Sequence, residues 1–172
     1  GPENNLLWRL EIKSGHSSPI VSGDLIFLTT FDQNEKRLSV VAIDRHRGEI
    51  RWERAVDAKE IERGHPSFNP ASSTPATDGE RVVAYFGSYG LVCFDFDGNK
   101  EWDLPLPCTK SYAGNAISPI IADDKVILYR GNFVDHFLLA VDKRTGTELW
   151  KTLQAEPFHA ELACTTLPIV QD

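Results

Sequence analysis

The sequence predicts an all-β fold, and within that class a partial β-propeller of about three four-stranded antiparallel blades. A motif Ala-x-Asp-x-x-x-Gly-x-x-x-Trp occurs at Ala42–Trp52 and Ala140–Trp150, with a shortened copy from Cys93 to Trp102. The four tryptophans are spaced by 44, 50 and 48 residues, and a repeat of this length is typical of propeller blades. The apolar runs are short and rich in Val, Ile, Phe and Tyr, which favours strands.

Each repeat unit resolves into short strands separated by turn signals. In the first unit we expect strands at Pro19–Val21, Leu25–Thr30, Ser39–Asp44 and Ile50–Arg54. The three units are predicted to cover residues 17–56, 72–107 and 117–155. One strand of a neighbouring blade is predicted at each end, at residues 6–12 and 163–172. Residues 1–172 would then form a single arc, because propellers need at least about four blades to close a ring.

The recurring motif residues have local physical roles. The Asp accepts hydrogen bonds from the backbone N–H groups that follow it, and the Gly adopts the positive φ of the turn. Strand propensity does not require Trp, so its recurrence indicates a pocket where one sheet packs on the next. Burial of the Trp side chain there contributes about 2–3 kcal/mol of stability at each seam. The predicted structural motif residues are Asp44, Gly48, Trp52, Asp95, Gly98, Trp102, Asp142, Gly146 and Trp150.

The motif, together with a Ser-Pro segment leading into each unit, resembles the tryptophan-docking motif of quinoprotein-type (PQQ-like) β-propellers. The resemblance runs from about Leu6 to Val170, and the middle copy departs from it by one deleted residue and by Cys93 in the Ala position. The sequence is most similar to large bacterial PQQ-like repeat proteins. The resemblance implies an extracytoplasmic location, periplasmic or secreted. Nothing else in the sequence supports this location, since the N-terminus shows no export signal.

The resemblance leaves two functions open, since the family includes quinone-dependent alcohol dehydrogenases and a non-catalytic assembly lipoprotein of the outer-membrane β-barrel machinery. Family enzymes are expected to hold PQQ near the axis with a stacked Trp, two adjacent cysteines, a calcium ion and an Asp base. This sequence has no adjacent cysteines, and the motif accounts for its tryptophans. We therefore predict a non-enzymatic scaffold without a cofactor. The alternative is part of a PQQ-dependent dehydrogenase or other redox enzyme with its active site in other blades.

Composition excludes several classes of partner and site. The net charge is −7, and the basic residues alternate with acidic ones, so nucleic-acid binding is not expected. No apolar run approaches the roughly 18 residues of a membrane span. Cys93, Cys108 and Cys164 have the spacing of neither a disulfide framework nor a zinc site. An arc exposes two blade faces, which favours self-association through those faces.

Candidate binding residues lie in the segments that lead into the innermost strands, where a propeller has its channel mouth. The hypothesis is that His16, Asn69, Asn115 and His159 converge at one face to bind a protein or a small polar ligand. The alternative is that small polar residues recur there only because the inner strands crowd near the axis. The spacing of the two histidines does not support a metal site. The longest linker starts at Asp57 and favours a short helical turn over Ala58–Glu62.

Overall fold

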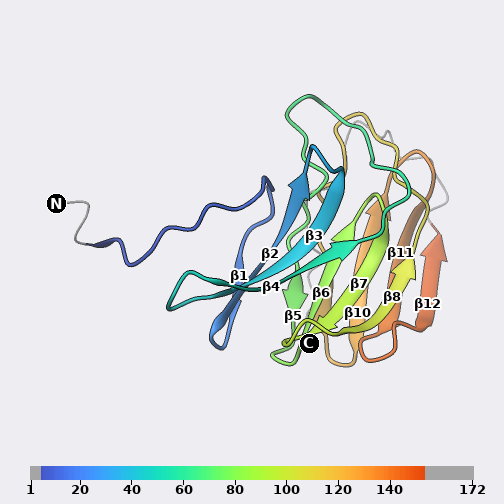
Figure 1. Cartoon of the computed structure of the whole chain (residues 1–172). Coiled ribbons are helices and arrows are strands. Elements are labelled where there is room, and N and C mark those ends of the chain that lie inside the picture. The colour runs from blue at the N-terminus through green and yellow to red at the C-terminus, as the bar shows by residue number, and fades with distance from the viewer. Residues whose placement is uncertain (1–4, 154–172) are drawn as a thin grey trace.

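The computed structural model of the protein describes residues 5–153. These residues form three four-stranded antiparallel sheets, here called blades (Figure 1). The strands follow chain order within each sheet. Blade 1 contains β1 (Ile20–Ser22), β2 (Leu25–Asp32), β3 (Arg37–Asp44) and β4 (Ile50–Val56). Blade 2 contains β5 (Ala76–Thr77), β6 (Arg81–Phe86), β7 (Gly90–Asp95) and β8 (Lys100–Pro105). Blade 3 contains β9 (Ile120–Ala122), β10 (Lys125–Gly131), β11 (His136–Asp142) and β12 (Glu148–Leu153). The predicted fold class is confirmed, whereas the predicted strand at 163–172 lies outside the described residues.

The blades fan out from their first strands. Strand β5 contacts both β1 and β9, the first strands of the neighbouring blades. Hydroxyl groups tie these inner edges together. The backbone N–H of Ser18 donates to Thr74 Oγ1 at 3.0 Å, and the backbone N–H of Thr74 donates to Ser118 Oγ at 2.9 Å. Each of these residues precedes the proline of its unit, so the same contact is made at both junctions.

The tryptophans join each blade to the next at the outer edge. The indole N–H of Trp52 donates to the Phe96 carbonyl of blade 2 at 2.8 Å, and that of Trp102 donates to the Lys143 carbonyl of blade 3 at 2.9 Å. Each ring covers the turn glycine of the next blade. A Cβ on Gly98 would lie 2.8 Å from the Trp52 ring, and one on Gly146 would lie 2.5 Å from the Trp102 ring. We call this arrangement the docking contact.

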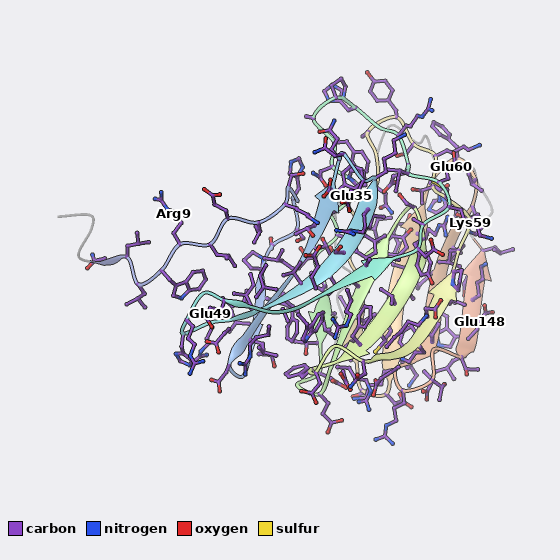
Figure 2. The ribbon with its side chains drawn as sticks, in the orientation of Figure 1. Arg9, Glu35, Glu49, Lys59, Glu60 and Glu148 are labelled. Atoms are coloured by element: carbon purple, nitrogen blue, oxygen red, sulfur yellow. The ribbon has the colours of Figure 1, made fainter. Side chains whose placement is uncertain are left out.

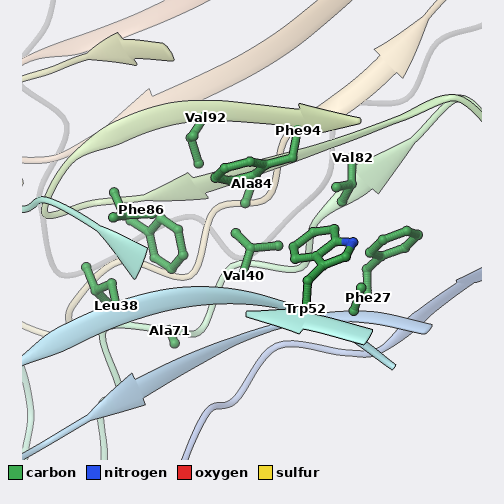
Figure 3. Packing of buried hydrophobic residues seen from close by; sticks show 12 residues of the cluster. Phe27, Leu38, Val40, Trp52, Ala71, Val82, Ala84, Phe86, Val92 and Phe94 are labelled. Carbon is green, nitrogen blue, oxygen red and sulfur yellow. The ribbon is translucent and has the colours of Figure 1, made fainter. Parts of the chain in front are cut away.

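Apolar side chains fill the two seams between the blades, and Figure 3 shows the first of them, between blades 1 and 2. In the first seam the ring centroid of Trp52 lies 5.9 Å from that of Phe27 in its own blade and 5.8 Å from that of Phe94 in blade 2. Successive residues of β6 point to opposite faces, so Val82 packs on blade 1 while Val83 packs on blade 3. Blade 2 is therefore buried on both faces, which explains its almost continuous apolar strands.

The two ends of the described chain differ from the seams. Residues 6–12 form no strand, and they extend away from the three sheets (Figure 1). Trp8 nevertheless makes the docking contact, with its indole N–H 2.9 Å from the Arg45 carbonyl and its ring over Gly48. At the other end Trp150 on β12 is 39% exposed, because the described residues contain no blade beyond it.

Replacing a docked tryptophan should cost more stability than replacing the equivalent exposed one. We expect Trp102→Ala to lower the free energy of unfolding by about 3–5 kcal/mol, because it empties a buried seam, and Trp150→Ala by no more than about 2 kcal/mol. Urea denaturation measures both. If Trp102→Ala prevents folding, Trp102→Phe gives the comparison, with an expected loss of about 1 kcal/mol for the indole hydrogen bond. Equal losses at the two positions would contradict this account.

Candidate functional site

The motif aspartates are used within their own turns. Asp44 Oδ1 accepts the backbone N–H groups of His46 and Arg47 at 3.0 and 2.9 Å. In blade 3, Asp142 Oδ1 accepts the equivalent N–H groups of Arg144 and Thr145, both at 2.9 Å. The hydrogen bond from Arg47 is the main reason why the pKa of Asp44 is lowered. These carboxylates close turns and are therefore not free for chemistry.

The structure places the four predicted binding residues in different surroundings. His16 is exposed, and its backbone N–H donates to the Ala71 carbonyl at 2.9 Å. Asn69 is buried beside it, where its Oδ1 accepts the Ala71 N–H at 2.8 Å and its Nδ2 donates to Ser14 Oγ at 3.2 Å. Asn115 is also buried, and its Oδ1 accepts the Ile117 N–H at 2.9 Å. His159 lies outside the described residues, so convergence of all four stays a prediction.

A buried carboxylate that the sequence did not single out lies between blades 2 and 3. Glu62 is 5% exposed and belongs to the linker that joins β4 to β5. Its backbone N–H donates to Ser88 Oγ at 3.0 Å, and its carboxylate accepts a hydrogen bond from the Thr109 hydroxyl. The carboxylate rests on Gly87, where a Cβ would lie 2.5 Å from Glu62 Oε2. The helical turn predicted over 58–62 is absent, because this segment is anchored by these contacts instead.

A buried arginine from blade 3 lies close enough to Glu62 to act on its charge. Arg130 on β10 is fully buried, its Nε lies 2.8 Å from Asp135 Oδ1, and it donates from Nη2 to the Pro107 carbonyl. Among residues 5–153, Arg130 Nη1, Glu62 Oε1 and Asn115 Nδ2 have no hydrogen-bond partner although all three atoms are buried. Such atoms are rare in folded proteins, so this cluster marks a place with unused capacity for hydrogen bonding.

Burial dominates the electrostatics of Glu62. It raises the pKa of this carboxyl to about 7, against the Thr109 hydrogen bond, the positive charge of Arg130 and the nearby N–H of Asn115, which lower it. Burial also raises the pKa of Tyr85, which lies against the same cluster. It raises the pKa of the Cys108 thiol to about 11. Glu62 can therefore exchange a proton near neutral pH, whereas the Cys108 thiol stays protonated.

A pocket of about 590 Å³ opens onto Glu62 from solvent. Its wall is formed by the two long linkers and the β10–β11 turn. The backbone N–H of Phe133 donates to the Lys110 carbonyl at 2.8 Å, and the Tyr112 ring lies 6.5 Å from the His65 ring, so the rim is braced. Figure 2 labels Glu60 on the first linker. The residues that line this Glu62 pocket are Glu60, Glu62, Arg63, Cys108, Thr109, Lys110, Ser111, Tyr112 and Phe133.

Comparison with known proteins finds similar proteins of two kinds. The sequence model of the family described as outer membrane protein assembly factor BamB matches residues 36–172. The BamB structure from Moraxella catarrhalis is similar to this chain with a TM-score of 0.57 and 19% identity, over 87% of this chain and 40% of that one. A europium-containing methanol dehydrogenase gives a TM-score of 0.55 and 15% identity, over 89% of this chain and 28% of that one.

A third similar structure is the quinohemoprotein alcohol dehydrogenase ADHIIG from Pseudomonas putida HK5, with a TM-score of 0.56, 20% identity, and coverage of 91% of this chain and 24% of that one. Comparison with curated proteins gives no match. The chain spans two fifths or less of each of these structures. At these identities the likeness establishes the fold, and it is equally good for assembly factor and dehydrogenase.

The described residues do not fit the quinone site that the family resemblance implies. The indoles of Trp52 and Trp102 are held in docking contacts, and Cys93 is buried in β7 while Cys108 lies in a linker. Within residues 5–153 no three His, Cys, Asp or Glu side chains are grouped so that they could hold a metal ion. The same residues contain no helix long and apolar enough to cross a membrane.

The raised pKa of Glu62 predicts a pH dependence of stability. Because the folded protein holds this proton more tightly than the unfolded chain, the contribution is fully present below pH 4.5 and is lost as the pH rises through about 7. The shift of about 2.5 pKa units corresponds to a loss on the order of 3 kcal/mol. Glu62→Gln should remove this slope in urea titrations between pH 4.5 and 7.5, and the exposed neighbour Glu60→Gln should keep it. If the free energy of unfolding changes with pH in the same way for Glu62→Gln and the parent, Glu62 is not the group responsible for the slope.

Proposed function

Because this chain belongs to the family of the outer membrane protein assembly factor BamB, with its PQQ-like propeller repeats, we propose that it is part of a non-catalytic propeller that binds a protein or a polar ligand. The proposed binding face is the end of the blades where the linkers 57–75 and 106–119 and the turn 132–135 meet, which we call the loop face. Figure 1 shows the two linkers at the same end of the sheets. Its location is proposed to be extracytoplasmic.

One observation carries this proposal: the Glu62 pocket combines buried, unpaired polar atoms with solvent access. The turn residues Asp44 and Asp142 and the docked indoles of Trp52 and Trp102 are already engaged in turns and docking contacts. Asn69 and Asn115 close turns with their amide oxygens. Glu62 Oε1, in contrast, has no hydrogen-bond partner within residues 5–153. A pocket of this volume, lined by charged and polar groups together with two aromatic rings, can hold a small polar ligand.

The rim of the pocket favours contact with another molecule. Tyr112 is 69% exposed and Phe133 is 65% exposed, and both lie on the loop face. Aromatic side chains that are open to water on a braced rim are typical of binding surfaces. The assembly-factor relatives make a protein partner reasonable for this face, and the described residues do not compose a quinone site, which supports the non-catalytic reading.

Ligand-detected saturation-transfer NMR tests this function with a panel of amino acids, tripeptides and mono- and disaccharides. We expect at least one class to bind, with affinity at least about 10-fold weaker in Tyr112→Ala, because stacking area on the rim is lost. Trp150→Ala removes an exposed aromatic ring on β12, outside the lining of the Glu62 pocket, and should leave binding unchanged. A panel without any binder would count against the proposal.

A second arm addresses the enzymatic alternative. The protein is incubated with pyrroloquinoline quinone and calcium, desalted, and examined for quinone absorbance. We expect none to be retained. Retained quinone at a ratio near one per chain, or alcohol oxidation by the incubated protein, would overturn the non-catalytic function.

A further inference from the structure

The floor of the Glu62 pocket offers a buried carboxylate that is only partly satisfied within residues 5–153, where the Thr109 hydroxyl donates to it and the Asn115 N–H and the positive charge of Arg130 act on it from nearby. Glu62 Oε2 is paired with the Thr109 hydroxyl, whereas Oε1 has no hydrogen-bond partner and no cation within ion-pair distance among residues 5–153. A buried carboxylate in this position is stabilised by a proton or by a positively charged donor. The group that best complements this floor is therefore an ammonium.

The rim of the same pocket offers unpaired positive charge. Arg63 and Lys110 are exposed, and their side chains form no ion pair with any described residue, in contrast to Lys13, Arg81 and Lys143 elsewhere on the surface. Both line the pocket on linkers that also supply its floor. A carboxylate that approaches from solvent would meet these two cations before it reached Glu62.

The remaining lining of the pocket is mixed, with Glu60, Thr109 and Ser111 as its polar members. Its apolar part is formed by the rings of Tyr112 and Phe133 and by the half-buried Cys108, whose thiol stays protonated. Phe133 is held beside Lys110 by a backbone hydrogen bond of 2.8 Å, so a positive charge and an aromatic ring stand next to each other on the rim. An apolar or aromatic substituent would lie against this wall.

We propose that the Glu62 pocket binds a zwitterion of the amino-acid type, with its ammonium on Glu62, its carboxylate between Arg63 and Lys110, and an apolar side chain against Tyr112 and Phe133. This inference rests on the proposed binding function of the loop face and names its ligand class. A simple anion would leave the floor carboxylate unpaired, and a simple cation would leave both rim cations unused. Only a ligand with both charges satisfies the three groups together.

Charges around Glu62 make the binding linked to a proton. Arg130 from blade 3, which is itself paired with Asp135, and Tyr85 from blade 2 act on Glu62, and Glu60, Arg63, Cys108 and Lys110 line the same pocket from the linkers. Since the ammonium takes the place of the proton, the local net charge is the same before and after the exchange. Near pH 7 the pocket should release about half a proton per ligand bound.

Isothermal titration calorimetry with three matched probes tests the proposal. L-Phenylalanine carries both charges, N-acetyl-L-phenylalanine lacks the ammonium, and L-phenylalaninamide lacks the carboxylate. We expect L-phenylalanine to bind, and each single-charge probe to bind at least about 10-fold more weakly, which is the loss of one charge-assisted hydrogen bond. Titration of L-phenylalanine in buffers of different ionisation enthalpy measures the released proton. Equal affinities for the three probes, or no proton release, would overturn the inference.

Variants locate the site. Glu62→Gln should weaken L-phenylalanine binding at least about 10-fold and abolish proton release, and the double variant Arg63→Gln/Lys110→Gln should weaken it similarly while leaving proton release intact. Glu148→Gln, on β12 and outside the lining of the pocket, is the control and should bind as the parent does. Unchanged melting temperatures for the rim variants show that the fold is kept. If Glu62→Gln does not fold, the rim variant carries the test.

Failure of this inference is separable from failure of the proposed function. If L-phenylalanine does not bind but a saccharide or tripeptide from the NMR panel binds in a Tyr112-dependent way, the zwitterion is wrong and the loop face remains a binding site. If no member of the panel and no phenylalanine probe binds, both proposals fail.

Discussion

Every other feature of this fold depends on the indole of one blade seated on the Asp-Gly turn of the next. The contact combines one directed hydrogen bond, from the indole N–H to the carbonyl after the Asp, with a ring that lies on a glycine where no Cβ fits. It therefore fixes both the distance and the rotation between neighbouring sheets. Hydroxyl bonds at the inner edges, from Ser18 to Thr74 and from Thr74 to Ser118, brace the same sheets at the other side. The apolar seams are packed between these two lines of contact.

The polar cluster is a result of this packing. At the end of the blades where the long linkers run, three separate segments bring Glu62, Thr109 and Arg130 together. A buried carboxylate and a buried guanidinium without full hydrogen bonding lower the stability of a fold. Their presence in a structure whose other turns are well satisfied points to a use that outweighs this cost. Such departures from local consistency are characteristic of functional sites.

The blades could be predicted from the sequence because their signals are local. Asp44, Gly48 and Trp52 stand in one short segment, and turn chemistry alone explains two of the three. The site could not be predicted in this way, since Glu62 and Thr109 are 47 residues apart and no spacing connects them. Arg130 did carry a signal, because it falls on the inward-facing side of the alternating strand β10. Asn69 and Asn115 stood out as polar residues near the channel mouth, but the structure shows that their amide oxygens close turns.

The direction of the docking contact has a consequence for assembly. Because each indole reaches forward onto the following turn, two copies of the chain would join head to tail, with Trp150 of one copy on the turn of Asp44 and Gly48 in the other, and such heterologous joints propagate unless they close. That turn is already covered by Trp8 of its own chain. The position that Trp150 of a second copy would need is thus already filled within the chain, and a head-to-tail joint of this kind would require Trp8 to leave the turn.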